Sequence, residues 1–185
     1  MMGRLPRWLK VRIPRGSHFG YVRRLLSDLK LATVCDHARC PNRAECYGAG
    51  CATFMILGEV CTRGCGFCAV KRGVPAPPDP TEPERVAEAV RRLGLRYVVI
   101  TSVTRDDLPD GGAGHFVAVI EAVRRAVDGC SVEVLVPDFG GDEGALRAVI
   151  EARPDVFNHN VETVRRLYGM SREALTWRRT AMCMS

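Results

Sequence analysis

Four short apolar segments, each followed by an amphipathic stretch, organise the sequence from residue 52 onward. The apolar segments cover residues 53–57, 97–100, 132–136 and 155–157. The amphipathic stretches, whose apolar residues recur at helical spacing, cover residues 82–93, 115–127, 143–152 and 162–168. Continuous apolar strands that alternate with such helices are typical of parallel βαβ units with right-handed crossovers. We therefore expect an α/β fold with about four β/α units, which is half of an eight-unit barrel or two thirds of a six-unit one.

Composition divides the 185 residues into three segments. Residues 1–51 are a basic arm with a cysteine-rich extension, residues 52–168 are the partial (β/α) barrel, and residues 169–185 are a tail without a strand signal. Within the extension, residues 21–30 favour a short helix and residues 35–50 an irregular loop. A hydrophobic content of 46% and a charged content of 26% exclude a disordered, collagen-like or coiled-coil chain. No apolar run approaches the ~18 residues of a membrane helix, so we expect no membrane association.

The net charge of +6 is concentrated at the N-terminus. The first 30 residues hold eight Lys or Arg and one Asp, and the remainder is nearly neutral. Such an arm could bind nucleic acid, an anionic membrane or an acidic protein, or it could be a solvated leader. A mitochondrial address is disfavoured because Pro6 and Pro14 interrupt an amphipathic helix, so we expect a cytoplasmic protein. Among the possible partners, we expect neither nucleic acid nor a membrane.

Six of the nine cysteines form two tight groups. The groups are Cys35-x4-Cys40-x5-Cys46 and Cys61-x3-Cys65-x2-Cys68. Without an export signal, clustered thiols indicate metal binding rather than disulfides. The second group follows the first predicted strand, and the loops after parallel strands are where function is usually placed. Three thiolates there can hold a cubane iron–sulfur cluster with one iron left open, and a three-cysteine zinc clip is the alternative.

Polar residues follow each of the other predicted strands, at 101–112, 137–138 and 158–162. Asp106, Asp107 and Asp110 are oxygen donors that a divalent cation could bind, but the adjacent Pro and Gly residues equally indicate a solvated turn. His159 is predicted to be a hydrogen-bonded structural histidine rather than a metal ligand. These loops should meet at one edge of the sheet, beside the second cysteine group.

The C-x3-C-x2-C spacing on the first β/α loop resembles the radical S-adenosylmethionine (radical SAM) superfamily. This resemblance implies a barrel of the radical SAM type, in which the open iron of a [4Fe-4S] cluster chelates the cofactor. The position of Phe67 resembles the aromatic position beside the adenine. Further cofactor contacts that the resemblance implies are Ser102, Gly111, Gly112, Asn158 and Glu162.

The first cysteine group extends the resemblance to the lipoyl synthase family, over roughly residues 4–168. The matching strings are VCDHARCPN (34–42), ATFMILG (52–58), CTRGC (61–65), FCAVK (67–71), TSV (101–103), DDLPDGGAGHF (106–116), VPDF (136–139) and DVFNHN (155–160). The resemblance implies a second, auxiliary [4Fe-4S] cluster on Cys35, Cys40 and Cys46. It also implies a sulfurtransferase of lipoate biosynthesis with radical chemistry at its clusters and no residue that acts as acid or base.

The reaction implied by this family is the insertion of two sulfur atoms at C6 and C8 of an octanoyl group, which a lysine of a lipoyl carrier domain holds. The cluster on the second group generates the adenosyl radical, and the auxiliary cluster donates the sulfurs. The expected partners are octanoylated E2 subunits of 2-oxoacid dehydrogenases and the glycine cleavage H protein, with a reductant such as flavodoxin or ferredoxin.

The sequence departs from the family pattern in two places. Cys51 stands where the family usually has threonine, and the match ends abruptly after Tyr168. We expect two further β/α units and the Arg-Ser-Ser-Tyr segment, whose serine is the family's fourth auxiliary ligand, to be absent, and the chain alone to be poorly soluble or inactive. Two alternatives stay open: another sulfur-inserting radical SAM enzyme that resembles biotin synthase, and an inactive metal-binding remnant.

Overall fold

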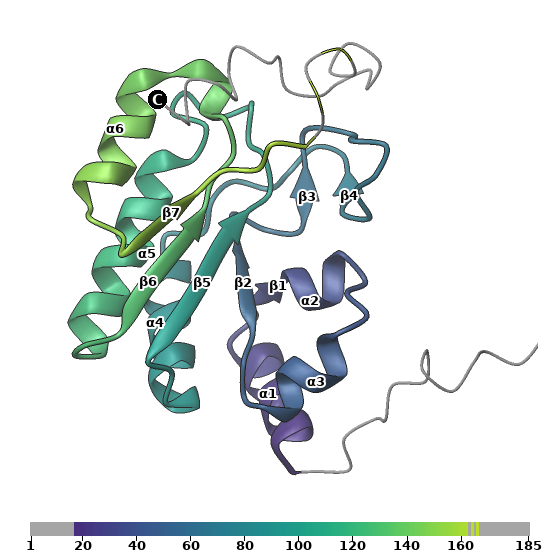
Figure 1. The fold of residues 1–185 in the computed structure, drawn as a ribbon, viewed down its shortest axis with the longest axis vertical. Helices are drawn as coiled ribbons and strands as arrows, with labels where there is room; N and C mark the ends of the chain where they lie inside the picture. The colour runs from purple at the N-terminus through teal and green to yellow at the C-terminus, as the bar shows by residue number, and fades with distance from the viewer. Residues whose placement is uncertain (1–16, 163, 165, 167–185) are drawn as a thin grey trace, which may run out of the picture.

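The computed structural model describes residues 17–162, 164 and 166. A five-stranded sheet of order β1-β2-β5-β6-β7 forms its centre (Figure 1). The strands are β1 (Ala32–Thr33), β2 (Thr53–Ile56), β5 (Tyr97–Ser102), β6 (Ser131–Leu135) and β7 (Val156–Asn158). The last four are parallel and adjacent in chain order, whereas β1 runs antiparallel to β2. The sheet is open rather than closed, which confirms the prediction of a partial β/α array.

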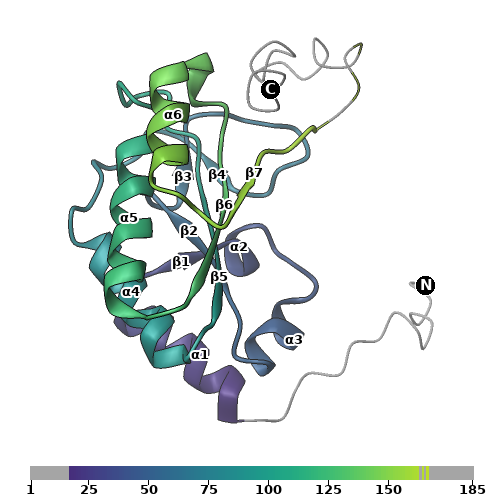
Figure 2. The ribbon, with the colours of Figure 1, turned by 60° about the vertical axis from the view of Figure 1, so that its left-hand side comes forward.

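Three helices connect the parallel strands: α4 (Glu82–Leu93), α5 (Ala113–Ala126) and α6 (Glu143–Glu151). Figure 2 shows all three on one face of the sheet, as right-handed crossovers require. α6 begins where the Asp142 carboxylate accepts the Gly144 and Ala145 N–H groups, and α4 ends at Gly94, whose φ of 64° is left-handed. The three predicted helices are therefore present, and the fourth, at 162–168, lies mostly outside the described residues.

The N-terminal extension is more regular than the sequence indicated. It contains α1 (Ser17–Asp28), α2 (Val34–His37) and α3 (Arg43–Gly48), so the irregular loop predicted for 35–50 is wrong. Tyr47 explains the order, because it is fully buried and its hydroxyl lies 2.7 Å from both Thr33 Oγ1 and Asp36 Oδ2. One buried aromatic ring therefore ties the two short helices to β1. The basic residues 1–16 and the tail 169–185 lie outside the described residues.

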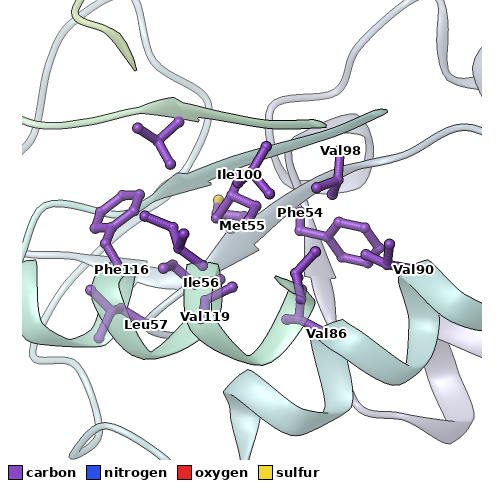
Figure 3. Packing of buried hydrophobic residues seen from close by; sticks show 14 of the residues in the cluster. Phe54, Met55, Ile56, Leu57, Val86, Val90, Val98, Ile100, Phe116 and Val119 are labelled. Atoms are coloured by element: carbon purple, nitrogen blue, oxygen red, sulfur yellow. The ribbon is translucent and has the colours of Figure 1, made fainter. Parts of the chain in front are cut away.

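The hydrophobic core lies between the sheet and the three crossover helices (Figure 3). Alternate strand residues enter it, including Phe54 and Ile56 from β2 and Val98 and Ile100 from β5, all at most 1% exposed. The residues between them face the other side of the sheet. There, Met55, Thr101 and Leu135 are register partners and form a row across three strands. The pleat thus gives the sheet an apolar side under the helices and a second side available for chemistry.

A tight turn follows β2 and starts the second cysteine group. Leu57 and Gly58 both have left-handed φ values, 67° and 92°. The Leu57 N–H donates to Glu82 Oε2 at 2.8 Å, and its carbonyl accepts from Arg105 Nη1 at 3.2 Å. The chain then enters a small parallel pair, β3 (Val60–Cys61) and β4 (Lys71–Arg72). Within the described ranges, no helix has the length and apolar character needed to cross a bilayer.

Gly112 provides a test of this turn. It precedes α5 with a φ of 93°, and a Cβ added to it would overlap Cδ1 of the buried Leu57. We expect Gly112→Ala to lower the free energy of unfolding by about 1–3 kcal/mol, because it adds a strained backbone and a clash. Chemical denaturation followed by circular dichroism measures the change.

Gly20→Ala is the matched control. Gly20 lies inside α1 with nothing within 4 Å of an added Cβ, so this variant should gain roughly 0.5–1 kcal/mol. Equal stability of the two variants would contradict the packing described for Gly112.

Candidate functional site

The second cysteine group lies on the loop that carries β3 and β4. Cys61 ends β3, the Cys68 N–H donates to the Cys65 carbonyl at 3.0 Å, and the Arg63 N–H points at Cys61 Sγ at 3.4 Å. Burial and the nearby thiols of Cys61 and Cys68 raise the pKa of the Cys65 thiol. The fold therefore brings three sulfur atoms into one region, as the spacing predicted, and a cationic centre would favour their thiolate forms.

Arg63 fixes this loop to the ends of two strands. Its guanidinium donates to both carboxylate oxygens of Asp138, at 3.1 and 2.9 Å, and its Nε donates to Asp106 Oδ2 at 2.7 Å. The Arg63 side chain is 8% exposed and that of Asp138 is fully buried. Thr62 adds a second tie, because its N–H and hydroxyl both reach the Thr104 carbonyl, at 3.1 and 3.0 Å. A loop with little regular structure thereby acquires a fixed position.

A cavity of about 280 Å³ lies beside the loop, at the C-terminal ends of β2, β5 and β6. The three cysteines of the second group line it, together with the row of Met55, Thr101 and Leu135. Much of its remaining wall is apolar, from Val103, Val136 and Pro137. Its size is near the lower end of the range of ligand sites, about 300 Å³. Sulfur ligands and an apolar chamber therefore share one space.

The structure brings some of the predicted cofactor contacts to this cavity and not others. Phe67, Ser102 and Glu162 line it. Asn158 is outside the lining, and its amide donates to Glu133 Oε1 at 2.6 Å. Whether any of these residues contacts the cofactor stays a prediction.

Gly111 and Gly112 also lie outside the lining of the cavity. The lack of a Cβ serves packing at both, since a Cβ on Gly111 would come within 3.1 Å of Phe139 Cα and one on Gly112 would overlap Leu57. Both glycines therefore allow two parts of this chain to pack closely. The Asp110 carboxylate accepts the Gly112 and Gly114 N–H groups, so it begins α5 rather than serving a cation.

The first cysteine group is next to the same cavity. Cys35 is buried in α2, while Cys40 and Cys46 are partly exposed. Burial raises the pKa of Cys35 and of Cys46, and the neighbouring Cys40 thiol adds to both shifts. Val34 and Ala38 of the α2 segment line the cavity. The α2 segment that carries Cys35 therefore borders the cavity, while Cys35, Cys40 and Cys46 themselves lie outside its lining.

Three cysteines are the donor set of a [4Fe-4S] cluster with one open iron. Among the described residues, no three His, Cys, Asp or Glu side chains are grouped tightly enough to hold one metal ion. In a cubane each thiolate binds a different iron atom, so its ligand sulfur atoms lie farther apart than those around a single zinc ion.

Comparison with known proteins decides the family. Residues 55–181 match the model of the radical SAM superfamily, and residues 2–40 match that of the N-terminal domain of lipoyl synthase of the radical SAM family. The chain belongs to the radical SAM superfamily. This membership implies a [4Fe-4S] cluster and S-adenosylmethionine, for which the second cysteine group and the adjoining cavity supply fitting residues.

Three curated relatives with which the chain was compared are lipoyl synthases. The chain is 60% identical over 163 residues to a lipoyl synthase of Rubrobacter xylanophilus. The aligned residues are 88% of this chain and 51% of the relative. It is 55% identical over 175 residues to that of Desulfotalea psychrophila, covering 95% and 58%. It is 58% identical over 172 residues to that of Caldanaerobacter subterraneus, covering 93% and 60%. The chain thus spans about half the length of the curated relatives it matches, and the alternative resemblance to biotin synthase is not favoured.

Three features of the site escaped the sequence reading: the buried charges of Arg63, Asp138 and Glu82. Glu82, in the first turn of α4, is 6% exposed, and its carboxylate accepts the Leu57 N–H. The position of Arg63 inside the cysteine motif was the available signal that it belongs to the site. Its partner, Asp138, lies 75 positions away in the sequence.

The Arg63 ion pair can be tested through stability. Arg63→Leu leaves the fully buried Asp138 carboxylate without its cation, so we expect a loss of about 3 kcal/mol in the free energy of unfolding. Adding Asp138→Asn should restore part of the loss, because the neutral amide still accepts from Gly140 N–H. Urea denaturation measures both.

Arg125→Leu is the control, since the Arg125 and Glu84 side chains are 60% and 69% exposed. Its effect should stay below about 1 kcal/mol. If Arg63→Leu were no worse than this control, the role of the buried pair would be disproved.

Proposed function

We propose that this protein acts in lipoyl group formation, by inserting two sulfur atoms at C6 and C8 of an octanoyl chain carried on a lysine of a lipoyl carrier domain. The observation that carries this proposal is the cavity that the second cysteine group lines and that the α2 segment borders. One wall holds Cys61, Cys65 and Cys68, and α2, which carries Cys35, supplies another. A reaction that uses one cluster to activate carbon and another to give sulfur needs both to reach the same substrate.

The residues of the chain provide confinement and position. When bound, the cluster and S-adenosylmethionine supply a 5′-deoxyadenosyl radical, which can remove hydrogen from an unactivated C–H bond. The apolar wall of Val103, Leu135 and Val136 suits an alkyl chain and limits the access of water. Arg63 and Thr62 hold the loop of the second cysteine group against the strand ends, so that the ligands stay close to this wall.

The partners follow from the same proposal. The carriers are octanoylated E2 subunits of 2-oxoacid dehydrogenases and the glycine cleavage H protein, and the reductant is a flavodoxin or a ferredoxin. The lipoyl synthases among the relatives and the sequence's basic arm support this choice, with the protein in the cytoplasm.

Metal content and cofactor cleavage test the proposal. After anaerobic reconstitution we expect about eight irons per chain, two cubanes, with matching acid-labile sulfide. Replacing Cys35, Cys40 and Cys46 by Ala should halve the iron while the cleavage of S-adenosylmethionine to 5′-deoxyadenosine persists. Replacing Cys61, Cys65 and Cys68 should abolish that cleavage.

Cys130→Ala is the matched control, because Cys130 is buried at the start of β6, away from both cysteine groups, and should leave iron and cleavage unchanged. With an octanoylated carrier, mass spectrometry should detect the two added sulfur atoms. An iron content near four atoms per chain would limit the proposal to one cluster. A chain that takes up only zinc would refute the proposal.

The basic arm gives a separate prediction about docking. Deleting residues 1–16 removes five positive charges, so binding to an acidic carrier domain should weaken, and the difference should shrink as ionic strength rises. Fluorescence anisotropy of a labelled carrier measures the affinity. An unchanged dissociation constant at low salt would assign the arm no role in docking.

A further inference from the structure

The two short helices of the N-terminal extension, α2 and α3, end in the same kind of turn. At the end of α2 the Cys40 N–H donates to the Cys35 carbonyl at 3.2 Å, and at the end of α3 the Cys51 N–H donates to the Cys46 carbonyl at 2.8 Å. In both turns the residue before the second cysteine has a left-handed φ, 53° in the first and 79° in the second. This is the Schellman ending of a helix, in which the side chains of the first and last residues commonly meet.

The sequence repeats together with the geometry. Residues 35–40 and residues 46–51 both read Cys-x-x-Ala-x-Cys. Cys51 therefore has the same place in the second turn that Cys40 has in the first. Because the first turn contributes both of its thiols to the first cysteine group, the second turn presents a matching pair, of which the sequence analysis used only Cys46.

A hydrogen bond fixes the two turns against each other. Tyr47, which follows Cys46, donates its hydroxyl to Asp36 Oδ2 at 2.7 Å, and Asp36 follows Cys35. The Tyr47 side chain is fully buried, so this bond is shielded from water. The two cysteine pairs are thus held in a defined relation rather than on independent loops.

The surroundings of the thiols place Cys51 beside the first cysteine group. Burial raises the pKa of the Cys46 thiol, and the neighbouring thiols of Cys40 and Cys51 add to the rise. Burial also raises the pKa of the Cys35 thiol, while a hydrogen bond from the backbone of Thr53, two residues after Cys51, opposes it. The segment that carries Cys51 therefore touches both turns.

The chemistry of the cluster calls for one more sulfur ligand than the first cysteine group contains. A [4Fe-4S] cluster with a thiolate on every iron takes four cysteines, and three leave one iron open. Cys51 is exposed, and its Sγ makes a long contact of 3.9 Å with the Ala49 carbonyl, which a metal bond readily replaces. A thiolate is also a softer and better ligand for cluster iron than the threonine hydroxyl usual at this position in the family.

We propose that Cys51 is the fourth thiolate ligand of the cluster held by Cys35, Cys40 and Cys46. The step is a ligand exchange at one iron, in which the thiol releases its proton to solvent and no electron is transferred. This inference rests on the proposed function for the presence of a cluster on the first cysteine group.

A chain that carries only this cluster gives the clearest test. Replacing Cys61, Cys65 and Cys68 by Ala in the full chain removes the second site, and anaerobic reconstitution should then give about four irons per chain. Brief oxidation with ferricyanide removes an iron that lacks a thiolate and leaves a [3Fe-4S] cluster, which electron paramagnetic resonance detects. We expect a weak [3Fe-4S] signal while Cys51 is present.

Cys51→Thr in this background should give a several-fold stronger [3Fe-4S] signal and release iron to a chelator at least about tenfold faster, because one iron has lost its sulfur ligand. Its melting temperature without iron should not change, since the side chain is exposed and similar in volume. Cys130→Ala is the matched control and should behave like the parent.

Alkylation of the chain with an unchanged sequence provides a second readout. Iodoacetamide should modify the exposed Cys51 readily in the iron-free chain, and reconstitution should protect Cys51 as well as it protects Cys40, as peptide mass spectrometry measures. Equal [3Fe-4S] signals with and without Cys51, or equal alkylation of Cys51 with and without iron, would overturn the inference.

The inference and the proposed function can fail separately. Iron bound without any role for Cys51 overturns the inference alone. Protection of Cys51 in a chain that adds no sulfur to an octanoylated carrier overturns the proposed function alone. A background chain that binds no iron overturns both the inference and the auxiliary cluster of the proposed function.

Discussion

The backbone of Leu57 is the point on which the site depends. It leaves β2 with a left-handed φ of 67°, a conformation that a branched side chain resists. Glu82 fixes its N–H and Arg105 fixes its carbonyl, and these two side chains come from different β/α units. The direction in which the chain enters the second cysteine group is thus imposed by two buried charges rather than by local preference. A change in either charge would redirect the loop that follows.

Those charges are tolerable because each has a second partner. Glu82 also lies 2.7 Å from His115 Nε2, and Arg105 donates to both oxygens of Asp107, at 2.8 and 2.7 Å. Arg105 lowers the pKa of the Asp107 carboxyl, so the pair keeps its charges down to acidic pH. Burying an unpaired ion would cost several kcal/mol, about the stability of a small domain. The two charges that hold the Leu57 backbone are therefore each paired with a second side chain.

The periodicity of the sequence was sufficient for the sheet, the crossover helices and the edge at which the site lies, because hydrophobic spacing encodes local structure directly. Periodicity failed where contacts between residues far apart in the sequence determine the local structure. Two short helices form around Tyr47 in a stretch whose composition indicated a loop. The sequence also could not show what an added Cβ would meet at Gly111 and Gly112, which is Phe139 at one and Leu57 at the other. Spacing also could not show that Arg63 reaches Asp138, since contacts 75 residues apart leave no periodic trace.

The pleat of the sheet separates stability from chemistry. Ile100 faces the core, while the next residue, Thr101, faces the cavity. A single strand therefore contributes side chains both to the hydrophobic core and to the site. The row of Met55, Thr101 and Leu135 is held in register by the same ladder bonds that fix the core, and Thr101 Oγ1 adds a bond to the Leu135 carbonyl at 2.8 Å. Ser102 Oγ and His159 Nε2 are buried in the wall of the cavity without a hydrogen-bond partner among the described residues. The face of the sheet that lines the cavity is therefore polar at these two points, whereas the face under the helices is apolar.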